Sequence, residues 1–538
     1  MSADEADSDD EGVDRTPSPR ADVCVVGAGP AGALVAAELS AAGHEVVVLD
    51  AGPRFDPDDR IDRMERHLRP GTDAPVWDTD PERDAYSSTG DREYPLNAAR
   101  VKGIGGTTLH WQGMVMRMHE QDFELRSSVG LGDDWPIDYD DLRPYYAAAE
   151  DELSVSGASD DPFAPPREEP HPLPAFPPSY SDSLFAEACE AVGLATHSVP
   201  NARNSEPTGE ASACVGYGTC KPVCPSGAKY DATRHIDIAE ANGARVLDRV
   251  PVQRLDHDGD HVTAAVYATP DGEEHRQEAR EFVVAAGGVE TPRLLLLSES
   301  EAYPNGLANS SGLVGRYFMD HLFAGMGGTL EEPTRQKHVG FNTTESHQFY
   351  DRPDDSRTAI KLEFLNYAGP APADIALTAD SFGDELLAEI REGYGTHVAM
   401  GALVEQLPRR ENRIRLDRSR TDDHGNPVPD VVWGVDGTTR RTIERANEIQ
   451  RAVLVQLGVD IGWTVGPENT GPAYHHMGTT RMGTDPAESV VNPQLRTHDL
   501  ANLTLAGSSV FVTGGAMNPT LTIAALSLKA ADHVAERL

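Results

Sequence analysis

Three glycines near the N-terminus have the spacing of a site that cradles the phosphates of a dinucleotide. Gly27, Gly29 and Gly32 follow the apolar run Val23 to Val26 in G-x-G-x-x-G spacing. The first glycine permits a tight turn, the second lets backbone approach a pyrophosphate, and the third lets a helix pack on the preceding strand. Asp50 ends the next apolar run, about 20 residues on, and can accept hydrogen bonds from a ribose hydroxyl. The alternative is a Gly-containing α/β turn that binds nothing.

Three cysteines form a second group with chemical potential. Cys214, Cys220 and Cys224 have C-x5-C-x3-C spacing in a loop rich in Gly and Pro. An odd number of thiols cannot all pair as disulfides, and grouped thiolates suit zinc or an iron-sulfur cluster. Zinc needs a fourth ligand, and neither Cys nor His lies between Cys224 and Tyr230, whereas a three-iron cluster needs one thiolate per iron. Zinc, an iron-sulfur cluster and structural cysteines, reduced or paired, all stay open here.

A second glycine-rich loop, Arg100 to Gly113, reads RVKGIGGTTLHWQG. Gly105 and Gly106 indicate backbone that packs closely against a ligand, and Thr107 and His110 offer polar groups to it. By spacing alone this segment is only a Gly-rich loop.

Strands and helices of an α/β fold must position these groups. The apolar run Phe282 to Ala286 leads into GGVETPRLLLLS, which predicts another strand, Gly turn and helix of the nucleotide-binding type. Leu503 to Ala506 predicts a strand, and Pro519 to Leu538 predicts a closing helix. The segment Trp135 to Tyr146 begins a helical region and a second domain. Residues 326 to 470 show strand-like runs with polar loops, which suits an antiparallel sheet that shapes a substrate cavity.

The composition bounds the partners and the surroundings. The 538 residues predict two or three domains at ~150 residues each. Acidic residues outnumber basic ones by 88 to 46, and the formal charge of −42 argues against nucleic acid or an anionic membrane as a partner. A self-repelling surface is tolerable where salt screens it. The composition therefore resembles that of a salt-adapted, haloarchaeal protein, and an ordinary acidic protein is the alternative.

No targeting segment is expected in this sequence. Residues 1–20 are acidic and polar, so we expect a disordered, solubilising tail and no signal peptide. No run reaches the ~20 apolar residues of a transmembrane helix. Cys24 and Cys189 are expected to be ordinary buried thiols. We expect a cytoplasmic protein, or one that is peripheral or exported only with a partner subunit.

Five motifs together resemble the glucose-methanol-choline (GMC) family of flavin oxidoreductases. They are the N-terminal GAGPAG with its distal aspartate, the loop GIGGTTLHW, the turn AAGGVETPRLLL, the phrase GRYFMDH at Gly315 to His321, and the pair YHHMGTTRMG and MNPTLTIAALSLKAADH. The resemblance implies bound FAD and oxidation of an alcohol or sugar hydroxyl. It also implies a doubly wound, Rossmann-like FAD domain interleaved with an α+β substrate domain on an antiparallel sheet.

The resemblance supplies the catalytic candidates. Family members carry a catalytic His in an H-x-x-G-T pattern and a His or Asn before the final helix, which are His475 and Asn518 here. A neutral imidazole is the usual acceptor for a substrate's hydroxyl proton, while an amide can only orient the hydroxyl. His476 is the alternative base, because an error of one residue in register would exchange the two.

The resemblance also assigns the flavin contacts and the division of the chain. His110 matches a position at which some relatives attach FAD covalently and others only contact it. The predicted cofactor-binding residues are Gly27, Gly29, Gly32, Asp50, Gly105, Gly106, Thr107, His110, Ala286, Gly507, Asn518 and Thr520. The predicted FAD domain comprises 21–120, 213–325 (with the cysteine loop 213–229) and 488–538, and the predicted substrate domain comprises 121–212 and 326–487.

The cysteine spacing further resembles that of GMC dehydrogenases whose catalytic subunit carries a [3Fe-4S] centre. It differs from the ferredoxin run, so a four-iron cluster is less favoured. We therefore predict a dehydrogenase of sugars, sugar acids or polyols that passes electrons through such a cluster. Relatives often work with a small helper subunit and a haem subunit. The alternatives are an oxidase that uses O2 and a flavin-binding electron carrier without turnover.

Overall fold

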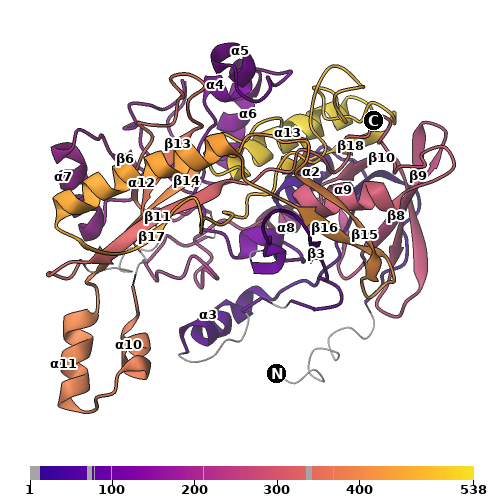
Figure 1. Cartoon of the computed structure of the whole chain (residues 1–538). Helices are drawn as coiled ribbons and strands as arrows, with labels where there is room; N and C mark the ends of the chain where they lie inside the picture. The colour runs from indigo at the N-terminus through magenta and orange to yellow at the C-terminus, as the bar shows by residue number, and fades with distance from the viewer. Residues whose placement is uncertain are drawn as a thin grey trace.

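The structure is a computed structural model that describes residues 13–69, 76–77, 79–98, 100–209, 211–334, 342–366 and 369–538. Two large sheets lie side by side, with helices packed on both (Figure 1). Among these residues, no helix is long and apolar enough to cross a membrane.

The first sheet has the strand order β7-β2-β1-β10-β9-β8, and β18 also pairs with β10. The strands β7, β2, β1, β10 and β18 run parallel, and β8 and β9 form an antiparallel extension on the long strand β10. The bounds are β1 Ala21–Val26, β2 Val46–Leu49, β7 Arg245–Leu247, β8 Val252–Asp258, β9 His261–Ala268, β10 Glu274–Val284 and β18 Leu503–Leu505. The strands β1, β2 and β18 and the C-terminal end of β10 are buried and mainly apolar, as expected of a sheet covered on both faces.

Four helices stack beside this sheet: α8 packs on α2, α2 on α13, and α13 on α6. They span Thr233–Ala241, Pro30–Ala41, Thr520–Ala535 and Tyr139–Glu152, in that order. The helix α9 (Gly287–Leu297) starts at the end of β10 and packs on β8. The sequence places α6 in the predicted substrate domain, yet its contacts are with the core of the nucleotide-binding sheet, so that part of the predicted division differs from the packing.

The second sheet has the order β17-β11-β14-β13-β12-β6, and all its pairs are antiparallel. Its strands are β6 His197–Ser198, β11 Leu322–Thr329, β12 Thr344–Ser346, β13 Ile360–Phe364, β14 His397–Val404 and β17 Asp460–Val465. The long helix α12 (Gly437–Leu457) lies along one face, and α7 (Tyr180–Ala191) packs on α12 (Figure 1). From the opposite face, Lys361 of β13 contacts Asn518 near the C-terminus.

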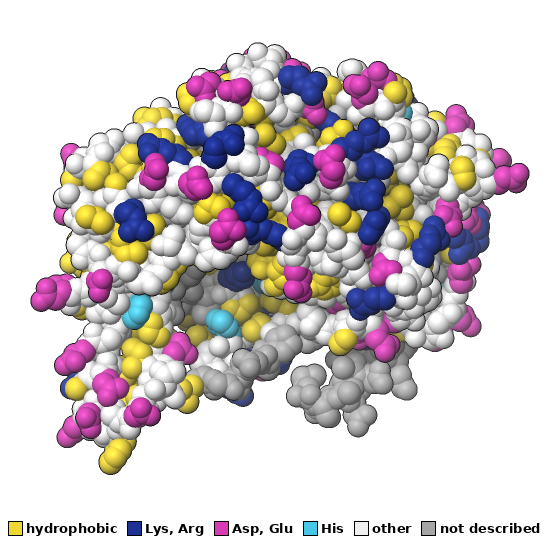
Figure 2. Space-filling view, viewed as in Figure 1, with side chains coloured by type: hydrophobic (Ala, Val, Ile, Leu, Met, Phe, Trp, Pro, Cys, Tyr) yellow, Lys and Arg dark blue, Asp and Glu magenta, His cyan; other side chains and the backbone are white. Residues whose placement is uncertain are grey.

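Smaller elements complete the fold. A three-stranded sheet joins β15 (Arg413–Thr421), β16 (Pro427–Val432) and β3 (Ser87–Ser88). The remaining elements are η1 Pro57–Asp59, α3 Arg60–Leu68, η2 Leu96–Ala98, η3 Gly106–Leu109, α4 Glu120–Phe123, α5 Leu125–Val129, β4 Ser156–Gly157, β5 Leu173–Pro174, α10 Pro372–Thr378, α11 Asp384–Gly393 and η4 Ser508–Val510. The helices α10 and α11 form an arm that projects from the body, and its surface carries both acidic and hydrophobic side chains (Figures 1 and 2).

The predicted fold class is confirmed. The similarity to solved structures reported below shows the same α/β architecture across nearly the whole chain. The predicted disorder of residues 1–20 is wrong for residues 13–20: Arg15 is buried, pairs with Asp248 at 3.0 Å and accepts a hydrogen bond from Tyr267 at its carbonyl. Residues 1–12 lie outside the described part of the chain. The contacts of Arg15 with Tyr267 on β9 and with Asp248 after β7 explain the order that composition alone did not predict.

Candidate active site

A cavity of about 410 Å³ opens at the carboxyl ends of the parallel strands, where ligands bind in open α/β sheets. Ten of the predicted cofactor-binding residues line it, and Gly32 and Gly105 do not. Those ten are Gly27, Gly29, Asp50, Gly106, Thr107, His110, Ala286, Gly507, Asn518 and Thr520. His475 lines the same cavity. Segments up to about 490 residues apart in the chain therefore meet around one space suited to a dinucleotide.

The glycines fit a bound pyrophosphate. Gly27 has a φ of +101°, and a Cβ there would lie 2.8 Å from the carbonyl oxygen of Ala285. A Cβ on Gly32 would lie 1.9 Å from the carbonyl oxygen of Gly27, so Gly32 serves the packing of α2 on β1. A Cβ on Gly29 would meet nothing within 4 Å, so the space beside this backbone is open. Gly29 also precedes the N-terminus of α2, which favours a phosphate in that space.

Asp50 braces the glycine turn. Its two carboxylate oxygens accept hydrogen bonds from the backbone N–H groups of Ala28 at 2.8 Å and Gly52 at 2.9 Å. Burial raises the pKa of this carboxyl. Each oxygen keeps a lone pair for a further donor, and the residue lines the cavity, so it can also meet a ribose hydroxyl.

His475 and Asn518 meet at the cavity wall. The Nδ2 atom of Asn518 lies 3.5 Å from Nε2 of His475. The backbone N–H of His475 donates to Asp320 at 2.8 Å, and the hydroxyl of Tyr94 donates to the other oxygen of the same carboxylate. Burial raises the pKa of Asp320 to about 7. Asp320 lies just before β11, so its carboxyl anchors the loop that carries His475 to the start of that strand.

His321 sets the proton position on His475. Its Nε2 lies 3.2 Å from the carbonyl oxygen of Gly514, which can only accept, so Nε2 carries the proton. Burial lowers the pKa of His321 to about 4, so its Nδ1 is a bare acceptor. His475 Nδ1 lies 2.8 Å from that atom and must donate to it. The neutral ring of His475 therefore presents the lone pair of Nε2 toward Asn518.

Burial is the main reason that the pKa of His475 lies well below the ordinary value of 6.5. The nearby His321 and the ammonium of Lys361 lower it further. A buried imidazole that stays neutral at physiological pH can accept a proton from a hydroxyl.

His476 has different surroundings. Its ring packs against Tyr94 and Phe318, and its Nε2 is buried without a hydrogen-bond partner. Burial lowers its pKa to about 3. Its carbonyl accepts a hydrogen bond from Ser508 at 2.5 Å. The adjacent histidine thus fixes backbone and fills space, although it also lines the cavity.

The cysteine loop reaches the same cavity. Lys221, directly after Cys220, lines it. Every sulfur of the group has an N–H donor nearby: Gly216 N lies 3.4 Å from Cys214, Lys229 N lies 3.5 Å from Cys224, and an Arg203 nitrogen lies 3.8 Å from Cys220. Donors of this kind stabilise thiolates and tune iron-sulfur centres.

The spacing of the sulfurs bears on the metal. Among the described residues, the group Asp161, His197 and His347 is the one set of three ligand side chains whose ligand atoms all lie within 4.8 Å of one another. At least one pair of the three sulfurs therefore lies more than 4.8 Å apart, farther than two thiolates on one zinc ion, whose Zn–S bonds are about 2.3 Å. A three-iron cluster separates its thiolates because each binds a different iron atom.

Sequence reasoning did not single out His321, Asp320 or Lys361. His321 and Asp320 end the GRYFMDH motif, so the motif contained them without showing their roles. Lys361 lies in the alternating run IKLEF, a pattern typical of a strand with one solvated face. In the structure that second face is buried against the site.

Comparison with known proteins gives the family. Two models described as GMC oxidoreductase match residues 25–323 and 408–527. The fructose dehydrogenase large subunit of Gluconobacter japonicus is 35% identical over 96% of this chain and 97% of its own length. The gluconate 2-dehydrogenase flavoprotein of Pantoea cypripedii is 27% identical over 96% of this chain and 94% of its own length.

Solved structures agree on the fold. Pyridoxine 4-oxidase from Mesorbium loti superposes with a TM-score of 0.65 at 19% identity, covering 96% of this chain and 99% of that one. Formate oxidase superposes with the same TM-score at 15% identity over 97% of this chain and 99% of that one. Because the family models cover most of its length and a 35% identical relative covers nearly all of it, the chain belongs to the GMC oxidoreductase family, FAD-dependent enzymes that act on CH–OH donors.

Proposed function

We propose that this protein is a FAD-dependent dehydrogenase that oxidises a CH–OH group of a sugar, sugar acid or polyol. The observation that carries the proposal is the pairing of His475 and Asn518 on the wall of the cavity that the dinucleotide-binding glycines form. The relatives named for fructose and gluconate support the substrate class.

When bound, FAD supplies the acceptor for the hydride that leaves the substrate carbon. Its phosphates would lie against Gly27 and Gly29, and its ribose against Asp50, while His110 would contact it from the second glycine-rich loop. His475 Nε2 accepts the hydroxyl proton, because Nδ1 already carries a proton held by His321. Such a base contributes roughly 10²-fold to 10⁴-fold.

Asn518 holds the same hydroxyl oxygen by donating from its amide. Its Nδ2 faces the space beside His475 Nε2, so one hydroxyl can donate to the imidazole and accept from the amide together. The substrate is thereby oriented before its C–H bond breaks.

We further propose that Cys214, Cys220 and Cys224 hold a [3Fe-4S] cluster, which would supply one-electron transfer to an external acceptor. The N–H donors at the three sulfurs and the entry of Lys221 into the cavity wall support this assignment. The name "large subunit" of the fructose dehydrogenase relative supports a complex with at least one further subunit.

An anaerobic substrate screen tests the function. Purified protein would be mixed with sugars, sugar acids and polyols, headed by fructose and gluconate, while the flavin absorbance is followed. Bleaching by one class, and its loss in His475→Ala, is expected. A flavin that no compound bleaches would indicate an electron carrier instead. Reoxidation by O2 at the full turnover rate would indicate an oxidase.

A further inference from the structure

A buried group of charges lies directly behind Asn518. Lys361 and Glu363 stand two residues apart on β13, and Glu345 stands on the neighbouring strand β12. The side chains of Lys361 and Glu345 are 0% exposed and that of Glu363 is 7% exposed. Buried charges of this kind are retained only when they are paired.

The pairing register of β12 and β13 brings these three charged side chains together. Residues alternate faces along β13, so Ile360, Leu362 and Phe364 enter the core while Lys361 and Glu363 point to the other face. Glu345 pairs with Glu363 across the strands, which places two like charges directly opposite each other. The Lys361 ammonium lies 3.4 Å from Glu345 and 2.7 Å from Glu363 and offsets both charges.

The ammonium of Lys361 makes its third contact with a residue of the candidate active site. Its Nζ donates to Oδ1 of Asn518 at 2.7 Å. An ammonium can only donate, so the amide oxygen must face Lys361 and the NH2 group must face His475. A flipped amide would place its NH2 group against the ammonium, and neither of these two donors could accept from the other.

We propose that Lys361, held by Glu345 and Glu363, is a positioning residue that fixes the amide of Asn518 so that it donates to the substrate oxygen. The inference rests on the proposed function, because it needs Asn518 to bind the reacting hydroxyl. Polarisation of the amide by the buried ammonium strengthens that donation.

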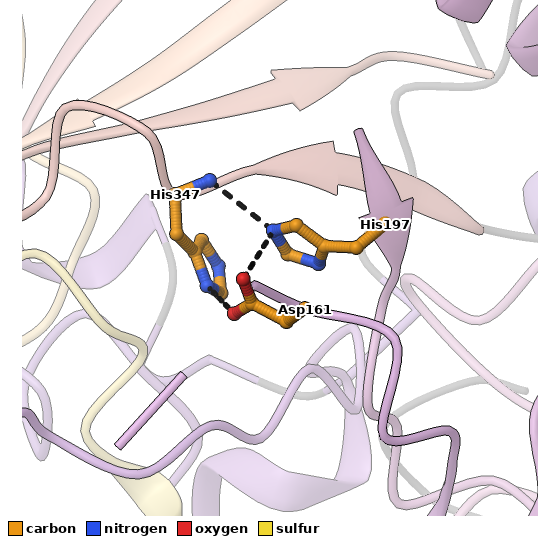
Figure 3. Close-up of side chains that lie close together, drawn as sticks. All are labelled: Asp161, His197 and His347. Atoms are coloured by element: carbon orange, nitrogen blue, oxygen red, sulfur yellow. Dashed lines mark hydrogen bonds and ion pairs between the residues drawn. The ribbon is translucent and has the colours of Figure 1, made fainter. Parts of the chain in front are cut away.

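Next to Glu345 lies a further cluster of polar side chains, Asp161, His197 and His347 (Figure 3). The ring of His347 lies between Glu345 at 3.0 Å and Asp161 at 2.6 Å, and these carboxylates raise the pKa of His347 to about 9 against the effect of burial. The His197 Nε2 accepts from the backbone N–H of His347. The His347 ring thus links Glu345 to Asp161 and steadies the Glu345 carboxylate beside Lys361.

A double-mutant cycle tests the inference. Lys361→Met should keep bound FAD but slow anaerobic flavin reduction by substrate about 10-fold to 100-fold, as expected when a hydrogen bond to a charged group is lost. In an Asn518→Ala background the same change should cost little more, because Lys361 acts through that amide. Independent, multiplying effects in the double variant would overturn the inference.

The pH profile is a second readout. Lys361, His321, His476 and Lys221 are the charged or titratable groups that lower the pKa of His475 besides burial. Removing the Lys361 charge should move the acid limb of flavin reduction to higher pH, and Asn518→Ala should leave it in place. An unchanged acid limb of flavin reduction in Lys361→Met would count against a charged Lys361 next to Asn518 and His475.

Controls separate folding and the function from the inference. Lys361→Met/Glu363→Gln restores the charge balance, and it should fold and show the same slow reduction. Arg117→Met removes another buried cation, paired with Glu150 at 2.8 Å outside the cavity wall, and should leave reduction unchanged. If Asn518→Ala itself reduces its flavin as fast as the parent, the proposed function fails. If Asn518→Ala is slow but Lys361→Met is fast, only the inference fails.

Discussion

The Nδ1 atoms of His321 and His475 lie 2.8 Å apart, and this one contact decides which nitrogen of His475 is free. His321 has its own proton on Nε2, held by the carbonyl of Gly514. Its Nδ1 can then only accept. Two residues that are 154 positions apart in the chain thus define the basic atom of the candidate site.

Replacing His321 should impair the reaction without removing the flavin. In His321→Leu the His475 ring loses its acceptor and can turn or exchange its proton to Nε2. We expect flavin reduction to slow by about 10-fold to 100-fold, the range found for partners that orient metal-bound imidazoles. Stopped-flow reduction under anaerobic conditions measures it. His321→Gln keeps an acceptor oxygen and should lose less; equal rates in both variants and the parent would refute the role.

His475→Ala should keep FAD and lose the reductive half-reaction, because its Nε2 is the proposed proton acceptor. The loss should be about 10²-fold to 10⁴-fold in the rate of flavin reduction. His476→Ala is the matched control, since it removes the adjacent ring and leaves the Asn518 contact intact. Asn518→Ala should cost less than His475→Ala. If His476→Ala were the inactive variant, the register of the motif would be wrong.

The reaction should tolerate acid further than a free imidazole allows. Burial lowers the pKa of His475, so its neutral, basic form persists below pH 6.5. We therefore expect the rate of flavin reduction to stay constant as pH falls from neutral to 6.5 and to decline only below it. Single-turnover rates of flavin reduction, measured from neutral pH to below pH 6.5, test this expectation. A limb near pH 7 would instead indicate Asp320, whose pKa burial raises to about 7.

Short sequence motifs predicted the local turns, strands and helices of the site, but they did not predict contacts between residues far apart in the chain. The glycine turns, the closing strand and helix, and the cavity-lining residues follow from short motifs, so ten of the predicted contacts line one cavity. The pairing of β12 with β13, by contrast, is set by the sheet register, and no sequence pattern shows which strand Lys361 will face. The ordered segment around Arg15 was missed for the same reason, because its partner Asp248 is 233 residues away.

Stability should depend on salt. The formal charge of −42 repels itself in dilute buffer, and screening at 1 M salt shortens the Debye length to ~3 Å. We expect the thermal midpoint to rise with KCl up to and beyond about 1 M. Sucrose at matched osmolality is the control for solute exclusion, because it stabilises without screening charge. A midpoint that stays constant or falls as KCl increases would contradict a salt-adapted surface.

Anaerobically purified protein should contain about three irons per chain, since each of three thiolates would bind one iron of a three-iron cluster. Cys220 is the most informative position. It is buried, an Arg203 nitrogen lies 3.8 Å from its sulfur, and the next residue lines the flavin cavity. Cys220→Ser should lose the iron and the paramagnetic signal of the oxidised cluster while it keeps FAD.

The same variant separates the two half-reactions. Substrate should still bleach the flavin of Cys220→Ser, because His475 and Asn518 are untouched, but transfer to a natural acceptor should fail. Cys189→Ala is the matched control, since that thiol is buried in α7 away from the group and should leave iron and transfer intact. Iron-free parent protein that still transfers electrons at the full rate to its natural partner would end the cluster assignment.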